Sequence, residues 1–194
     1  MNNDYGNYTL TYIDSVTYYN YLGSKAEALK NNESYVVNKK NRENYISTFS
    51  YPEQRIIGTN DLIDQIKNNK INLIKAYLSN VLENTKTPNF SIEASQNIKN
   101  HKIHSSLKNV LVVISKYQNR FFTIIGIILS IYFILKLNKK QTLYSLISLY
   151  IIYTIAISGI SFTQGDRFHI VIFPFVIILI VIFIKSNINL YRKY

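Results

Sequence analysis

Three long apolar runs follow one another in the last third of the chain. They cover residues 121–137, 143–162 and 168–184, with short polar breaks between them. Apolar runs of about 17 to 20 residues match the hydrocarbon thickness of a bilayer, because an α-helix rises about 1.5 Å per residue. In the most apolar stretch, 170–184, only Pro174 is not a large apolar residue. A core helix of a soluble protein keeps polar residues on one face, so the pattern predicts three transmembrane helices.

Residues 1–107 carry shorter and weaker apolar patterns in a polar, Asn-, Lys- and Tyr-rich background. The stretch 5–12 alternates in the manner of a strand. A helix capped near Asp14 is predicted to reach Leu29, because its apolar residues recur every three to four positions. No period is visible over 32–58, so that stretch is predicted to be a loop.

Three further helices are predicted before or into the first apolar run. One begins at a cap near Asn60, and another starts near Ser106 and runs into the first span. The helix between them carries an amphipathic stripe and ends before Pro88. The stripe consists of Ile71, Ile74, Tyr77, Leu78, Val81 and Leu82. Such a stripe packs inside a domain or lies in the membrane interface, and the pattern alone leaves both open.

Together these patterns predict an all-α membrane protein with a mainly helical extracytoplasmic region over 1–107 and a membrane region over 108–194. Basic residues in short loops favour the cytoplasm. Those that follow the first and third runs, such as Lys139 and Arg192, place these breaks inside and the N-terminal region outside. The opposite orientation, with Arg120 inside, is the alternative. The opening residues form no secretory signal, so we expect earlier membrane helices and a chain that is the C-terminal piece of a larger cell-membrane protein.

Composition narrows the classes of function. The formal net charge of +11 raises nucleic acid as a partner, but the basic residues are scattered among acids up to Glu93, so none is expected. The chain contains no Cys, which excludes disulfides, thiolate catalysis and Cys-based metal sites. After Glu93 the only carboxylate is Asp166. Acid–base chemistry near the membrane must therefore use Asp166 or a group from outside this chain.

Metal and cofactor sites are not expected. His101 and His104 are spaced to share a helical face, but solvated histidines are the simpler interpretation. Asp61 and Asp64 are interpreted as first-turn helix acids and not as a metal pair. The many tyrosines of the first region either stack on sugars or form a small core, and we interpret them as core.

A group of ionisable residues stands at the start of the third apolar run. Asp166, Arg167 and His169 lie together there, and charges at a bilayer boundary indicate a site or an anchor. The planar guanidinium of Arg167 is suited to a phosphate. The alternative is an interfacial Arg167 that reaches lipid headgroups, with Asp166 as the N-cap of the helix.

This segment resembles the last-helix motif of polytopic glycosyltransferases of the GT-C superfamily, especially bacterial and archaeal relatives of the protein O-mannosyltransferases. The family motif reads Arg-Tyr-Arg-Leu-Pro-x-x-Pro, and the positions that match it here are Arg167, Phe168, His169, Ile170 and Pro174. Val171 replaces the first proline of the motif. Two upstream stretches, 18–26 and 66–78, are similar to extracytoplasmic segments of the same enzymes.

The resemblance implies a membrane glycosyltransferase that uses a polyprenyl-phosphate-linked sugar. Arg167 and His169 would bind the donor phosphate, and Asp166, Tyr19 and Tyr21 would line the site. These enzymes carry their catalytic acid in a first extracytoplasmic loop that this chain lacks, so no catalytic residue is assigned and the chain alone is not expected to be active. The rival class is a non-enzymatic multi-pass anchor or assembly protein, in which Arg167 meets only lipid headgroups.

Overall fold

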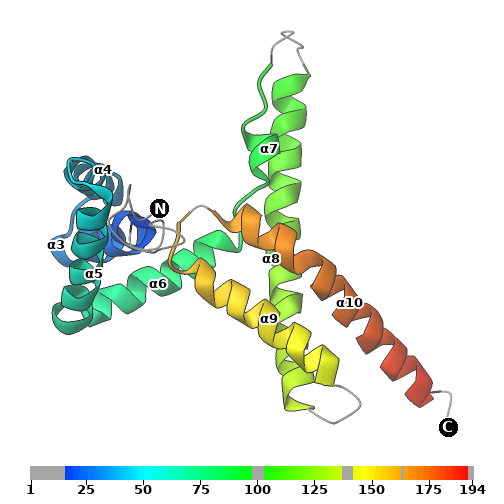
Figure 1. Ribbon diagram of the computed structural model, residues 1–194. Coiled ribbons are helices and arrows are strands. Elements are labelled where there is room, and N and C mark those ends of the chain that lie inside the picture. Colours follow the sequence, from blue (N-terminus) through cyan, green and yellow to red (C-terminus); the bar gives the residue numbers. More distant parts are fainter. Residues whose placement is uncertain (1–15, 98–102, 137–141, 163, 192–194) are drawn as a thin grey trace. The chain divides into compact units, whose positions relative to one another are not determined.

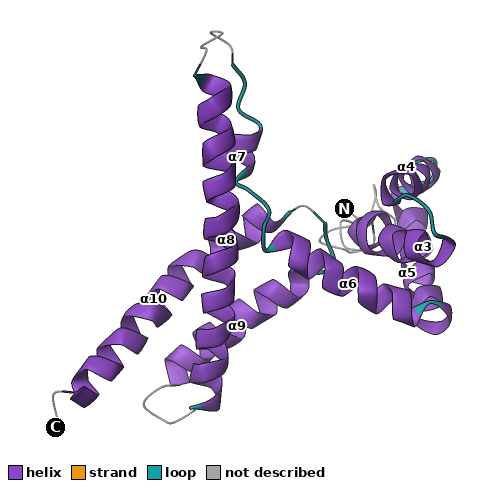
Figure 2. Cartoon of the chain, turned by 180° about the vertical axis from the view of Figure 1, so that it is seen from behind, coloured by secondary structure: helices purple, strands orange, loops and turns teal. Residues whose placement is uncertain are grey.

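A computed structural model describes residues 16–97, 103–136, 142–162 and 164–191. Every regular element in these ranges is a helix (Figures 1 and 2), so the all-α prediction is confirmed for them. The strand-like stretch 5–12 lies outside the described residues. The chain forms two compact units. Unit 1 is Met1–Val81 with Gly159–Phe162, and unit 2 is Leu82–Ser158 with Thr163–Tyr194. The predicted boundary between an extracytoplasmic region (1–107) and a membrane region (108–194) is of a different kind and stays a prediction.

The described part of unit 1 begins with a helix that follows the predicted pattern, and the predicted cap at Asp14 lies outside the described residues. A π-helical turn, η1 (Tyr18–Gly23), continues directly into α3 (Ser24–Asn31). The helix stops where expected, because Asn32 adopts a left-handed conformation with φ of 55°. Asn tolerates this conformation better than most residues, which makes it suitable after the last helical turn.

The predicted loop over 32–58 is wrong, because most of this stretch is helical. It contains α4 (Tyr35–Ile46) and the first turns of α5 (Tyr51–Asn68). The helix expected from Asn60 therefore starts nine residues earlier. Its start is fixed by a capping box, in which the Ser50 backbone N–H donates to the Glu53 carboxylate over 2.9 Å. Proline in the first turn of a helix costs no internal hydrogen bond, so Pro52 favours this start.

The stripe-bearing helix is confirmed as α6 (Lys70–Asn84). Its face around Ala76 joins a core in which Tyr18, Tyr19, Leu22 and Ile46 are buried. Two of the N-terminal tyrosines thus belong to the packed interior of unit 1. The helix passes from unit 1 into unit 2 between Val81 and Leu82.

A buried guanidinium joins four segments of unit 1. Arg42 on α4 donates through Nε to the Tyr19 carbonyl over 3.1 Å and through Nη2 to Asp61 over 2.6 Å, and it also pairs with Glu27. Its charge lies over the Tyr19 ring, 3.7 Å from the centroid. Burial raises the pKa of the Asp61 carboxyl, although the hydrogen bond from Arg42 acts in the opposite direction. Asp61 is therefore an ion-pair partner, and Asp64 accepts a hydrogen bond from the Asn68 amide.

Unit 2 contains the predicted spans, except for Gly159–Phe162 at the end of the second one. Its helices are the short α7 (Phe90–Glu93), α8 (His104–Leu135), α9 (Thr142–Ser158) and α10 (Gly165–Tyr191). Two segments, His104–Leu135 and Gly165–Ser186, are long and apolar enough to cross a membrane. The second apolar run is helical only as far as Ser158, and α9 is an apolar helix of 17 residues.

The three long helices of unit 2 contact one another through small and polar residues. The buried positions of α8 include Ser115, Asn119, Thr123, Gly126 and Ser130, spaced three or four residues apart. A Cβ atom on Gly126 would lie 2.8 Å from Cγ2 of Val176 on α10, so only glycine permits this close approach. Ile172, Val176 and Leu179 of α10 fill the rest of the interior.

Candidate functional site

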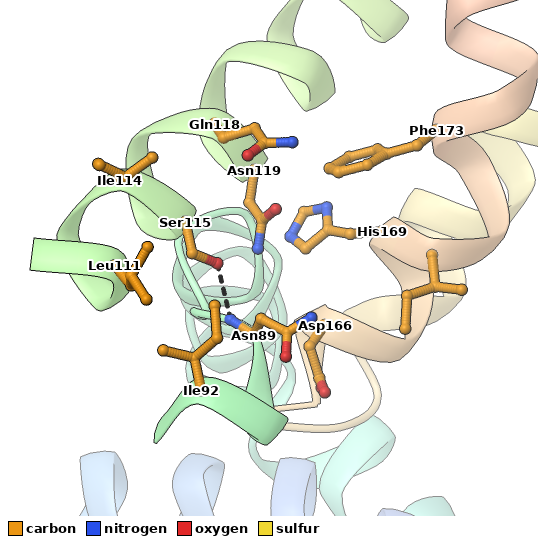
Figure 3. A pocket seen from close by; sticks show the side chains of 11 residues that line it. Asn89, Ile92, Leu111, Ile114, Ser115, Gln118, Asn119, Asp166, His169 and Phe173 are labelled. Carbon is orange, nitrogen blue, oxygen red and sulfur yellow. Dashed lines mark hydrogen bonds between the residues drawn. The ribbon is translucent and has the colours of Figure 1, made fainter. Parts of the chain in front are cut away.

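A pocket of about 310 Å³ opens in unit 2 beside the first turns of α10 (Figure 3). Polar side chains make up one part of its lining and apolar side chains the other. It is lined by Asn89, Ile92, Leu111, Ile114, Ser115, Gln118, Asn119, Asp166, His169, Ile170 and Phe173. These residues come from α7 with its N-cap, from α8 and from α10, so three segments distant in sequence build one cavity.

Hydrogen bonds hold α7 against the polar side of α8. The Asn89 side chain caps α7 by accepting from the Ser91 N–H over 2.9 Å. The Asn89 backbone N–H donates to Ser115 Oγ over 2.8 Å, the bond drawn in Figure 3. One turn further along α8, the Asn119 amide donates to the Thr87 carbonyl over 2.7 Å. The wall of the pocket is therefore fixed by three polar contacts.

His169 is bound by the protein at both ring nitrogens. Its Nε2 donates to the Asn84 carbonyl over 2.9 Å, because a carbonyl can only accept, and its Nδ1 lies 3.3 Å from Thr123 Oγ1. The residue is 4% exposed. A ligand would have to break one of these contacts to reach a ring nitrogen, so His169 acts first as a structural link between α8, α10 and the end of α6.

Asn84, which the sequence analysis did not single out, organises the start of α10. Its amide donates to the Ser158 carbonyl over 2.7 Å, and its Oδ1 accepts from the Gln164 N–H over 3.3 Å. A Cβ on Gly165 would collide with the Asn84 carbonyl, so glycine is required there. The available signal was the pair Asn80 and Asn84, which lie one turn apart on α6.

The predicted site residues lie in different surroundings. Asp166 lines the pocket with His169, whereas Arg167 is exposed and is not part of the lining. Tyr19 and Tyr21 belong to unit 1, where Tyr19 is buried and the ring of Tyr21 lies 4.8 Å from the Lys39 ammonium. Their assignment to a donor site stays a prediction.

The capping role considered for Asp166 is wrong. The helix α10 begins at Gly165, so Asp166 stands inside its first turn. A carboxylate there interacts favourably with the positive end of the helix dipole without acting as the N-cap. His104 begins α8, and His101 lies outside the described residues.

The lining of the pocket determines which chemical groups suit it. Among the described residues of the lining Asp166 is the only charged one, while Asn89, Gln118 and Asn119 offer amide donors and acceptors. A carboxylate disfavours an anion within the cavity, whereas hydroxyl groups can donate to Asp166 and exchange hydrogen bonds with the amides. Within the residues that the structure describes, no group of three His, Cys, Asp or Glu side chains could hold a metal ion.

Comparison of the chain with protein-family models, curated proteins and solved structures finds no match.

Proposed function

We propose that this chain is a multi-pass membrane protein in which α8, α9 and α10 cross the bilayer. The observation that carries the proposal is the outer surface of unit 2, which consists largely of exposed aliphatic side chains. Hydroxyl and amide groups are buried between the helices, beside an apolar core. The outward residues of α8 and α10 include Phe121, Ile124, Ile128, Ile131, Ile170, Ile177, Ile178, Val181 and Ile184. Lipid is the surrounding in which such a surface is stable.

The arrangement of side chains on α9 supports this helix as the third span. Ser145, Ser148 and Ile151 are buried in α9, and Ser145 Oγ donates to the Phe133 carbonyl of α8 over 2.9 Å. Leu146 and Leu149 point outward. A helix of 17 residues is at the short end of the length needed to cross a bilayer, and local thinning of the bilayer accommodates such a span. In this proposal the N-terminal region is extracytoplasmic.

Within this framework we propose that the chain is the C-terminal part of a glycosyltransferase that takes a polyprenyl-phosphate-linked sugar. The motif around Arg167 supports the class of enzyme. Arg167 is exposed in the first turn of α10, beside a pocket that offers Asp166 and amide groups. A guanidinium outside the cavity suits the lipid phosphate, and the carboxylate and amide groups of the lining suit sugar hydroxyls.

A second candidate is a non-enzymatic membrane subunit. It is favoured by the state of His169, because both ring nitrogens already bind protein groups. In that case Arg167 meets lipid headgroups only, and the polar contacts at the start of α10 serve to hold the helices together.

Membrane insertion is tested by alkaline extraction of membranes from cells that produce the chain. We expect the chain to stay in the membrane pellet and to require detergent for release. Recovery of folded, monodisperse protein in detergent-free buffer would overturn the proposal.

Donor recognition is tested by direct binding of polyprenyl phosphate to the detergent-purified chain. We expect Arg167→Ala to lower the affinity at least tenfold and Arg167→Lys to restore only part of it, because a lysine cannot form the two-pronged contact. Lys185→Ala is the matched control, since this exposed cation lies on the same helix, about 27 Å from Arg167 at about 1.5 Å per residue. Equal affinity for Arg167→Ala and Lys185→Ala would favour the non-enzymatic subunit.

A further inference from the structure

The helix α6 has an exposed apolar face, which the described residues of the chain do not cover. Ile71, Ile74, Leu78 and Leu82 are 63%, 58%, 54% and 63% exposed. At about 3.6 residues per turn, these positions share one side of the helix. The opposite side is fully buried, with Ala76 and Asn80 at 0% exposure. One edge of the stripe therefore points outward, whereas Tyr77 of the same stripe packs against the core of unit 1.

Charge selects the kind of partner that fits this face. Lys70 and Lys75 are exposed and flank the apolar stripe on its two sides. Between Lys67 and Leu82 the sequence contains no Asp or Glu. A helix with an apolar face bordered by lysines suits a membrane surface, where the aliphatic side chains enter the headgroup region and the ammonium groups meet lipid phosphates. A second copy of the chain fits less well, since it would bring the same lysines close together.

The end of α6 is held at the level where the proposed spans begin. Asn84, its last residue, donates to the Ser158 carbonyl at the end of α9 and accepts from His169 in the first turns of α10. In the proposed insertion these helix ends mark one boundary of the bilayer. A helix that ends at this boundary and has an exposed apolar edge is suited to lie along the membrane surface.

We infer that α6 is an interfacial helix, whose Ile71, Ile74, Leu78 and Leu82 side chains enter an anionic lipid surface while Lys70 and Lys75 bind lipid phosphates. This inference rests on the proposed membrane insertion of unit 2. It adds a second mode of lipid contact, in which part of the polar N-terminal region also binds the bilayer.

The absence of cysteine from the sequence gives a clean experiment. A single Ile74→Cys variant of the full chain is labelled with an environment-sensitive fluorophore and reconstituted into vesicles of phosphatidylcholine and phosphatidylglycerol. Val36→Cys is the matched control, because Val36 is an aliphatic residue of unit 1 with 71% exposure and lies on α4. We expect several-fold stronger quenching by spin-labelled lipids at position 74 than at position 36, together with a blue-shifted emission.

Two further variants make the outcomes distinct. Ile178→Cys on α10 reports the proposed span, so lipid quenching at 178 without quenching at 74 overturns only the interfacial helix. Absence of quenching at both positions overturns membrane insertion as well. Combining Lys70→Gln and Lys75→Gln with Ile74→Cys should reduce the quenching in the anionic vesicles, and an unchanged signal contradicts the role of the lysines. Protection at position 74 from both lipid and aqueous quenchers would indicate a protein partner and also overturn the inference.

Discussion

The two units of this chain are packed around different interiors. In unit 1, tyrosine, leucine and alanine side chains form the core, and the buried guanidinium of Arg42 pairs with two carboxylates. In unit 2, serine, threonine and asparagine side chains lie between the helices beside a core of large apolar residues, and further aliphatic residues are exposed on the outer surface. The arrangement of unit 2, with uncharged polar groups between helices and an aliphatic exterior, is one that a bilayer favours.

Polar contacts also differ in kind between the units. The Arg42 cluster holds full charges, and its cost of desolvation is offset only while all partners are present. The contacts around Asn84 and His169 use amides, carbonyls and one imidazole, each with a hydrogen-bond partner. Unit 1 should therefore be most sensitive to the loss of one charge, and unit 2 to the introduction of one.

The largest effect is expected for Arg42→Ala. The variant leaves Asp61, whose side chain is 19% exposed, without its cation, and removing one partner of a buried pair costs about 3–5 kcal/mol. Amide hydrogen exchange of the detergent-solubilised full chain should show faster opening of α3 and α5, with little change in α9. Equal acceleration of α9, or none in α3 and α5, would contradict the separate stability of the units.

The pH dependence of Arg42→Ala sharpens this test. Burial already raises the folded-state pKa of Asp61, and loss of the guanidinium raises it further. A carboxyl with a raised folded pKa favours the folded state below its unfolded pKa, and this advantage is lost as pH rises through the folded pKa. The defect should therefore shrink in acid and grow towards neutral pH. The double variant Arg42→Ala with Asp61→Asn should recover part of the stability and show a weaker pH dependence.

An introduced charge should have the next largest effect, and only in unit 2. Ile178→Asp places a carboxylate on the outward face of α10, where insertion scales assign about 2.5–3.5 kcal/mol to a charge at the centre of a span. Val36→Asp in unit 1 is the matched change and should alter stability by less than about 0.5 kcal/mol. The effect of Ile178→Asp is measured as the fraction of the chain that inserts into membranes. The effect of Val36→Asp on stability is measured by amide hydrogen exchange. Similarly small effects of Ile178→Asp and Val36→Asp would contradict the proposal that the aliphatic surface of α10 faces lipid.

The smallest effect is expected for Ser50→Ala at the start of α5. Ser50 and Glu53 form the capping box, and loss of a capping side chain costs about 0.5–2 kcal/mol. The change should appear as faster exchange in the first turn of α5. Ser47→Ala is the control, because the Ser47 hydroxyl donates only to the Asn44 carbonyl and supports no helix N-terminus. Indistinguishable hydrogen exchange in Ser50→Ala and Ser47→Ala would show that the capping box does not determine where α5 begins.

Local patterns correctly predicted the elements whose evidence lies within a few turns. The apolar runs identified the helices that became α8, α9 and α10, and the stripe near Ile74 identified α6. The loop predicted over 32–58 was wrong because α4 has few apolar positions at a helical period. Arg42, a charged residue, supplies much of its contact with the rest of unit 1.

The candidate site divides in the same way. The sequence alone singled out Asp166, Arg167 and His169, because charged residues beside a long apolar run are visible locally. Only the tertiary structure separated their roles, with Asp166 and His169 in the pocket and Arg167 outside its lining. The contact of His169 with Asn84 joins residues 85 positions apart. Helical periodicity carries no information at that separation, so the partners of a buried polar group are decided by how the helices pack.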